Sequence, residues 1–194
     1  GGSYSFGHPS DEPYIAGNGA DGTLRAELPG EADTNLAGWN QIGLGVQEVY
    51  VAYTVRYADD FQFPQGIKQL IFFSGSSWGW TDVVGSSSGD WPAYIAAKFE
   101  GTEYGGIGTT GDGSGDNEAN AIRAGEWYQI EFYASLTDDT IRLWKNGELI
   151  VENTSAGLTV GDIGTFEMGN TWWGASTVDQ DSHIDFGHVY ISIR

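Results

Sequence analysis

Four features are scarce or absent in this sequence of 194 residues. It has no cysteine, which excludes disulfides, thiolate metal sites and a cysteine nucleophile. It contains no apolar run long enough for a membrane-spanning helix, and no secretory signal peptide is visible at its start. It has 8 Lys and Arg residues against 27 Asp and Glu residues, a formal net charge of −19. That imbalance argues against nucleic acid and anionic lipid as partners, because both need cationic side chains to neutralise them.

The excess of acid has two interpretations. Surface carboxylates keep a protein soluble, whereas carboxylates gathered in a loop can bind calcium, which takes about six to eight oxygen ligands. The acidic turn at 59–60 and the stretches GDGSGDNE (111–118) and VDQDS (178–182) offer such oxygens, although none has the spacing of an EF-hand loop. Calcium is therefore the one cofactor that the sequence favours, in a structural role. Its candidate ligands are Asp112, Asp116, Asp179 and Asp181.

Alternation of apolar and polar residues dominates what is present, together with 30 glycines. We expect strands at 22–28, 47–57, 67–74, 93–99, 126–135, 139–145, 148–153, 163–170 and 183–193. Three long loops separate some of them, at 75–92, 101–120 and 171–182. No convincing helical pattern occurs. The sequence predicts one all-β domain over residues 1–194, an antiparallel two-sheet jelly-roll sandwich with an irregular segment at 1–20.

The clearest local signal is Asn146-Gly147 between two alternating runs, which favours a two-residue type I′ hairpin. This turn predicts three cross-strand pairs. They are Lys145 with Glu148, Trp144 with Leu149, and Leu143 with Ile150.

Three stretches carry a resemblance. GEWYQIEFYASLTDDTIRLWKNGELI (125–150) resembles a strand trio of the concanavalin A-like jelly rolls, the superfamily of lectins, glucanases and laminin-G-like domains. DSHIDFGHVYISI (181–193) resembles their closing strand, and EVYVAYTVRYADDFQFPQGIKQLIFFSG (48–75) resembles the polysaccharide-lyase-like branch. The resemblance implies two curved, stacked sheets, with glycans bound on a concave face or at its rim loops. Many members carry structural calcium, and members include lectins, hydrolases, lyases and structural domains.

Aromatic residues are the sharpest indication of a ligand, because the apolar faces of sugars stack on large, rigid rings. Strand parity also places polar and aromatic residues together on faces opposite to apolar rows, while Trp127 and Trp144 are interpreted as core. We expect a glycan site with a rim of loop tryptophans and a floor of strand residues. The rim is Trp78, Trp80, Trp91, Trp172 and Trp173, and the floor is Tyr50, Arg56, Tyr94, Glu131 and Tyr133.

Two enzymatic alternatives are a retaining glucanase and a polysaccharide lyase. Retaining glucanases of this fold carry Glu-x-Asp-x-x-Glu on one strand, and no such run occurs here. A lyase needs a cation for the uronate carboxylate and a base for the C5 proton. The candidates are Lys68, His188, Tyr190 and Arg56. The net charge would repel a polyuronate, the alginate-lyase motifs Gln-Ile-His and Tyr-Phe-Lys-Ala-Gly are missing, and a lysine within an apolar strand is more often paired, with Asp185 as a plausible partner here.

The sequence therefore predicts non-catalytic recognition of a polysaccharide by a lectin-like, extracellular or surface-exposed domain. A polysaccharide lyase or glycoside hydrolase acting on the concave face is the first alternative, with the lyase favoured over the hydrolase. A structural or adhesion domain of a cell or virion surface is the second. Neither nucleic acid nor membrane insertion is expected.

Overall fold

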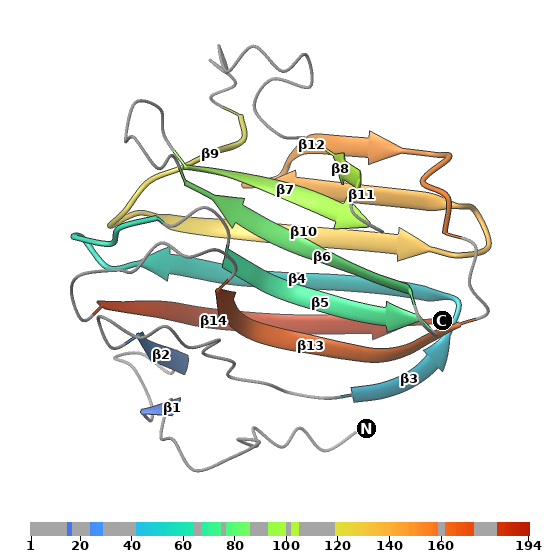
Figure 1. Ribbon diagram of the computed structural model, residues 1–194, viewed down its shortest axis with the longest axis horizontal. Coiled ribbons are helices and arrows are strands. Elements are labelled where there is room, and N and C mark those ends of the chain that lie inside the picture. Colours follow the sequence, from blue (N-terminus) through green and yellow to red (C-terminus); the bar gives the residue numbers. More distant parts are fainter. Residues whose placement is uncertain are drawn as a thin grey trace.

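A computed structural model shows two antiparallel sheets stacked face to face (Figure 1). It describes residues 15–16, 24–28, 42–63, 67–74, 77–85, 93–99, 102–104, 119–158, 162–172 and 182–194. Within these ranges every regular element is a strand, so the all-β jelly-roll prediction is confirmed. The same ranges contain no helix with the length and apolarity needed to cross a membrane. That the chain forms one domain stays a prediction.

The first sheet has seven strands. In spatial order they are β1 (Ile15–Ala16), β2 (Leu24–Leu28), β14 (Ser182–Ile193), β4 (Glu48–Tyr57), β10 (Trp127–Ser135), β11 (Thr140–Lys145) and β12 (Glu148–Asn153).

The second sheet lies in front of the first in Figure 1 and also has seven strands. In spatial order they are β3 (Ile42–Val46), β13 (Ile163–Trp172), β5 (Ile67–Ser74), β6 (Ser77–Val84), β7 (Ala93–Phe99) and β8 (Thr102–Tyr104), with β9 (Ala121–Ile122) also paired to β7.

The core lies between the two sheets because alternate residues of each strand point to the same face. In β4 every second residue from Val49 to Tyr57 is buried, and the residues between are only partly buried. β10 repeats the pattern, with Tyr128, Ile130 and Phe132 buried. These rows match the parity expected from the sequence. The opposite rows of both strands therefore lie on the outer face of the first sheet.

A polar network crosses the core between the sheets. Gln69 of β5 is 1% exposed and accepts a hydrogen bond of 2.8 Å from the Tyr53 hydroxyl of β4. Its amide also donates to the Tyr57 hydroxyl, and Thr81 of β6 lies 3.5 Å from the Tyr53 oxygen. Burial raises the pKa of Tyr53 above its ordinary value, so the Tyr53 phenol stays protonated. The network fixes how the two sheets sit against each other.

The hairpin at Asn146-Gly147 forms with both residues at positive φ, 52° and 80°, as a type I′ turn requires. Lys145 pairs with Glu148 and Trp144 with Leu149, as expected. The third predicted pair is wrong. A bulge between Leu143 and Trp144 sets Leu143 opposite Val151 rather than Ile150, because β12 accommodates one extra residue.

The predicted strands all occur, with ends shifted by a few residues. The predicted loop at 75–92 is wrong over 77–84, which form β6 in the interior of the second sheet. Its Gly and Ser residues have low strand propensity, but pairing with β5 on one side and β7 on the other outweighs it. β13 likewise extends to Trp172, beyond the expected end at 170.

Candidate functional site

The outer face of the second sheet carries two of the three lysines of the chain. Thr81 and Val83 of β6 are buried in the core, so Asp82 between them lies on the outer face. Lys68 of β5 is the register partner of Asp82, and Lys98 of β7 is the register partner of Trp80. Directly paired residues share a face of a sheet. We call this outer face, with Lys68 and Lys98, the lysine face.

Tryptophans occupy the same face. Trp78 and Trp80 are two residues apart in β6 and flank the buried Gly79, so both lie on the lysine face. Trp172 ends β13 as the register partner of Ile67, one position from Lys68, which places it on the core face of its strand. Trp91 and Trp173 lie outside the described residues, as do the four aspartates expected to bind calcium. Two of the five rim residues are thus placed together.

Tyr94 of β7 also belongs to the lysine face. It pairs with Val84 of β6 and precedes Lys98 by four residues, with Ala96 between them. The backbone spacing puts Tyr94 and Lys98 about 13 Å apart, and Lys68 lies two strands from Ala96, about 10 Å away. Tyr94 is 8% exposed. Lys68, Lys98 and Tyr94 therefore lie around one patch of the second sheet, with spacings of about 10–13 Å.

The rest of the expected floor lies on the other side of the sandwich, on the outer face of the first sheet. Tyr50 of β4 is directly opposite Tyr133 of β10, while Glu131 pairs with Ala52. Arg56 is at the far end of β4, six residues from Tyr50 and about 20 Å along the strand. Floor and rim were expected to form one site, but the structure divides them between two opposite faces. Alternation within a strand shows which residues share a face of that strand, but it does not show which strands belong to the same sheet.

A hollow of about 310 Å³ opens on this outer face, at the end where β4 starts and β14 stops. We call it the tyrosine hollow. It is lined by Glu48, Val49, Tyr50, Tyr133, Tyr190, Ser192 and Arg194.

Tyr50 is fixed within the hollow by its hydroxyl, which donates to Glu131. The Gln129 amide donates to the other oxygen of that carboxylate at 3.1 Å. Burial, and then the hydrogen bond to Glu131, raise the pKa of Tyr50 to about 12. Tyr50 is therefore a neutral hydrogen-bond donor at physiological pH and a poor base.

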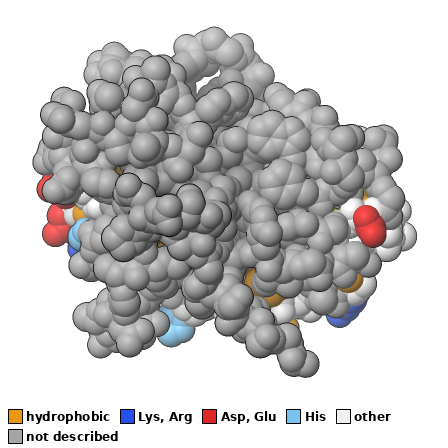
Figure 2. All heavy atoms as spheres, turned by 60° about the horizontal axis from the view of Figure 1, so that its bottom comes forward, with side chains coloured by type: hydrophobic (Ala, Val, Ile, Leu, Met, Phe, Trp, Pro, Cys, Tyr) orange, Lys and Arg blue, Asp and Glu red, His pale blue; other side chains and the backbone are white. Residues whose placement is uncertain are grey.

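Two arginines of this face, Arg56 and Arg142, are engaged by carboxylates. Arg142 lies 5.7 Å from the centre of the Tyr133 ring and binds Glu152 at 2.7 Å. Arg56 binds Asp59 at 2.5 Å and donates from Nε to the Gly125 carbonyl. Described acidic side chains come into view at both ends of the molecule in Figure 2.

Asp185 is not the partner of Lys68 that the sequence analysis considered. It lies in β14 of the first sheet, opposite Arg56, with His183 Nε2 at 3.7 Å. Lys68 lies in the other sheet, opposite Asp82 and Thr171. The two residues belong to opposite outer faces of the sandwich.

His188 and Tyr190 do not follow simple alternation. The register of β14 against β4 shifts between Gly187 and Tyr190, and His188 has φ of 50°. Because of this bulge Tyr190 pairs with Ala52 and lies on the outer face, whereas unbroken alternation from the buried Phe186 would have turned it inward. Of the four lyase candidates, only Lys68 lies on the lysine face.

Two tryptophans expected in the core are not there. Trp127 is 48% exposed at the start of β10, and Trp144 is only partly buried on the outer face, opposite Glu131. The alternation of β10 and β11 instead buries Tyr128 and Lys145. The β-strand periodicity was correctly identified, but large apolar rings were assigned to the wrong side of it.

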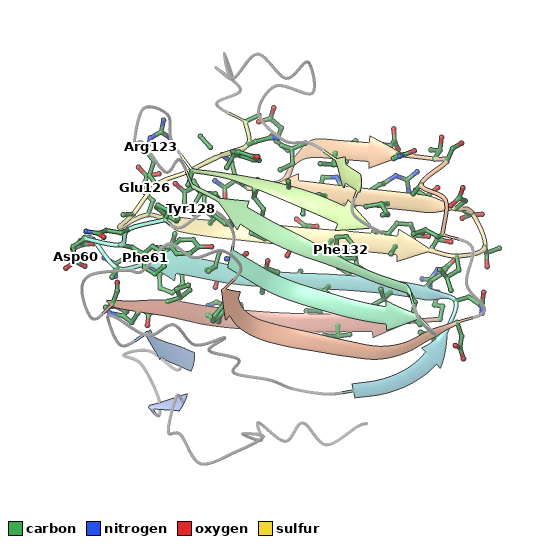
Figure 3. The ribbon with its side chains drawn as sticks, viewed as in Figure 1. Asp60, Phe61, Arg123, Glu126, Tyr128 and Phe132 are labelled. Carbon is green, nitrogen blue, oxygen red and sulfur yellow. The ribbon has the colours of Figure 1, made fainter. Side chains whose placement is uncertain are left out.

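A third polar cluster closes one end of the sandwich. Figure 3 shows Arg123, Glu126 and Tyr128 at that end, near Asp60 and Phe61. The Tyr128 hydroxyl donates to Glu126 at 2.8 Å and accepts from the Arg123 backbone at 2.7 Å. Burial and Glu126 raise the pKa of Tyr128 to about 12.

The buried Lys145 also belongs to this cluster. Its ammonium donates to the Ala121 carbonyl at 2.7 Å and lies 5.4 Å from the centre of the Tyr128 ring. We interpret the cluster as structural, since its polar atoms satisfy one another.

No group of three or more His, Asp or Glu side chains close enough to hold a metal ion occurs in the described ranges. Asp59 of the acidic turn is bound by Arg56. Calcium stays a prediction on the aspartates at 112, 116, 179 and 181.

Comparison with known proteins identifies the class of fold. No protein-family model matches the chain, and no curated protein matches it. Solved structures do match, and they show that the chain has the concanavalin A-like jelly-roll fold.

The matched structures include alginate lyases. A mutant of alginate lyase Aly36B in complex with alginate trisaccharide matches with a TM-score of 0.64 at 15% identity, over 90% of this chain and 83% of that one. Alginate lyase AlgAT5 from Polysaccharide Lyase family 7 gives 0.61 at 8% identity, over 91% and 81%. The alginate lyase from Klebsiella pneumoniae gives 0.61 at 12% identity, over 91% and 83%.

These matches correct the main functional expectation. We predicted a non-catalytic, lectin-like module, and that prediction is wrong, because structures that share the fold over nine-tenths of the chain are polysaccharide lyases. The first alternative is the better one. The missing motifs had argued against it, but at 8–15% identity short motifs need not persist where the fold does.

Proposed function

We propose that this protein is a polysaccharide lyase that cleaves a uronate polymer on its lysine face, and that alginate is its substrate. The observation that carries the proposal is the meeting of Lys68, Lys98 and Tyr94 with Trp78 and Trp80 on one outer face. The likeness to alginate lyases supports the reaction class, and complexes with alginate oligosaccharides among those structures support the substrate.

The reaction is a β-elimination, which needs little from the protein beyond charge and a proton acceptor. A base removes the proton at C5, the electrons of that bond form the C4–C5 double bond, and the C4–O glycosidic bond breaks. The departing oxygen takes up a proton. The uronate carboxylate next to C5 must be neutralised, because the transition state places further negative charge there.

The lysine face has side chains for each of these tasks. Lys68 and Lys98 are the cations that neutralise the carboxylate. Tyr94 is the phenol of this face and the group assigned to proton transfer. Trp80 lies between the strands of the two lysines and offers an aromatic surface for the adjoining sugar.

The opposite face is less suited to this chemistry. Its arginines at 56 and 142 are bound by Asp59 and Glu152. Tyr50 is held in its protonated form by burial and by Glu131. Arg56, His188 and Tyr190 are therefore left out of the proposed catalytic set.

The test is an assay for unsaturated ends. Incubation with alginate is expected to raise the ultraviolet absorbance, because each elimination leaves a conjugated C4–C5 double bond. Lys98→Ala should remove most of the activity. Arg123→Gln removes one positive charge from an exposed loop at the end of the sandwich and is the matched control. Wild-type protein that gives no absorbance change on alginate or on other polyuronates would refute the proposal.

An extracellular or surface location goes with this function, because a polymer of this size is met outside the cell. The proposal needs no metal in the chemical step, since the lysines supply the positive charge. Calcium is proposed only as a structural ion, and a melting temperature that falls on chelation would test it.

A further inference from the structure

We infer that the tyrosine hollow is a second binding site for the polysaccharide, one that holds a pyranose unit of the polymer while the lysine face acts on another stretch. The inference rests on the proposed function only for the identity of the polymer. The hollow itself is defined by described side chains on the outer face of the first sheet, on the opposite side of the sandwich from the lysine face.

The shape of the hollow follows from one small residue among large ones. Tyr190, Ser192 and Arg194 follow one another at every second position of β14 and the residue after it, so all three face outward. Ser192 lies opposite Tyr50, which in turn lies opposite Tyr133. The short serine side chain between Tyr190 and Arg194 leaves the space of about 310 Å³.

The bulge in β14 is what brings Tyr190 to this place. It holds His188 at a φ of 50°, a left-handed conformation that is unfavourable for a residue other than glycine. The result is a tyrosine that is 58% exposed and stands edge-on to Tyr50, with ring centres 6.2 Å apart. The strained backbone and the exposed aromatic ring both make folding less favourable. A ligand that binds the ring accounts for this arrangement.

The walls offer what a sugar ring needs. The rings of Tyr133 and Tyr190 provide surfaces for the C–H face of a pyranose. Ser192 and Glu48 are hydrogen-bonding partners for hydroxyls, and the exposed Arg194 has donors for a hydroxyl or a carboxylate. Tyr50 is already fixed to Glu131, so the wall is rigid before the ligand arrives.

Affinity electrophoresis tests the site directly. Native gels would contain alginate, a neutral β-glucan or no polymer, and the Lys98→Ala background prevents cleavage during the run. Tyr190→Ala removes the exposed ring. It should weaken binding about three- to tenfold to whichever polymer slows the parent protein in the gel. Ser192→Phe fills the hollow and should weaken it equally, while Tyr190→Phe keeps the ring and should bind as the parent does.

Trp127→Ala is the matched control, because Trp127 is an exposed aromatic ring on the same sheet but about 20 Å from the hollow. Reduced retardation in Tyr190→Ala and Ser192→Phe, but not in Trp127→Ala, supports the site, and the gel in which it occurs identifies a uronate or a neutral sugar as the ligand. Equal mobility of Tyr190→Ala and its parent in both polymer gels overturns it. The absorbance assay on wild-type protein is separate, so failure of the lyase proposal would be seen independently.

Discussion

The two outer faces of this sandwich both combine aromatic rings with charged residues, yet they differ in the cations that they carry. On the first sheet Arg56 and Arg142 are each held by a carboxylate, and tyrosines line the hollow. On the second sheet two lysines occupy neighbouring rows with Trp80. The first arrangement suits the holding of a sugar, and the second suits the stabilisation of developing charge.

The difference shows why residue type alone misled the sequence analysis. Arg56 and Lys68 are both cations, and Tyr94 and Tyr190 are both phenols, so residue type does not separate them. Only the order of strands separates them, since β4 and β14 lie in one sheet and β5 and β7 in the other. A catalytic function needs its groups on one face, and this requirement selects Lys68, Lys98 and Tyr94.

The largest effect is expected from removing the proposed catalytic groups of the lysine face. We expect Lys98→Ala and Tyr94→Phe each to lower kcat/KM on alginate by about 10²–10⁴-fold, because neutralisation and proton transfer contribute on this scale. The rate of absorbance increase measures the effect.

The counterpart on the other face is Tyr133→Phe, which keeps the ring and removes only a hydroxyl. If Tyr133→Phe abolished cleavage while Tyr94→Phe left it intact, the assignment of the two faces would have to be exchanged. Circular dichroism of each variant would separate a lost catalytic group from a lost fold.

A second prediction concerns what joins the two faces. Gln69→Leu should lower the free energy of unfolding by about 2–3 kcal/mol, because it removes the partner of the buried Tyr53 hydroxyl and one partner of Tyr57. Urea denaturation measures the change. Gln129→Leu alters a glutamine that is exposed on the outer face, and it is expected to stay within about 0.5 kcal/mol of wild type. Equal effects of the two variants would show that the network does not hold the sheets together.

The core was the part of the fold that the sequence predicted best. Alternation in β4 and β10 identified the buried rows from Val49 and from Tyr128 because both strands are long and regular. Alternation did not predict the bulges of β12 and β14, since an extra residue leaves no mark in composition. The glycine before His188 is the one local sign of the second bulge, and it is a weak one.

A third prediction, with a smaller expected effect, concerns the tryptophans. Trp80→Ala should raise KM for alginate about fivefold with little change in kcat, because a stacking ring contributes about 1 kcal/mol to binding. Trp127→Ala removes a ring of the same kind from the other face and should leave KM unchanged. Initial rates over a range of alginate concentrations give both constants. A larger rise for Trp127→Ala than for Trp80→Ala would place the substrate on the first sheet.

The smallest expected effect concerns the ionisation of Tyr50. Burial and Glu131 raise the pKa of Tyr50 to about 12, above the ordinary value of about 10. The folded state therefore favours the protonated phenol. The stability that this contributes is fully present below pH 10 and is lost as the pH rises towards 12.

Spectrophotometric titration of the phenols should accordingly lose one late-ionising group in Tyr50→Phe, and the alkaline fall in melting temperature should become slightly less steep. Glu131→Gln keeps the ring and replaces the anion that holds the proton, so the same phenol should then ionise closer to pH 10. An unchanged late phase in Tyr50→Phe would show that the hydroxyl is not held by Glu131, and the tyrosine hollow would lose the rigid wall on which sugar binding depends.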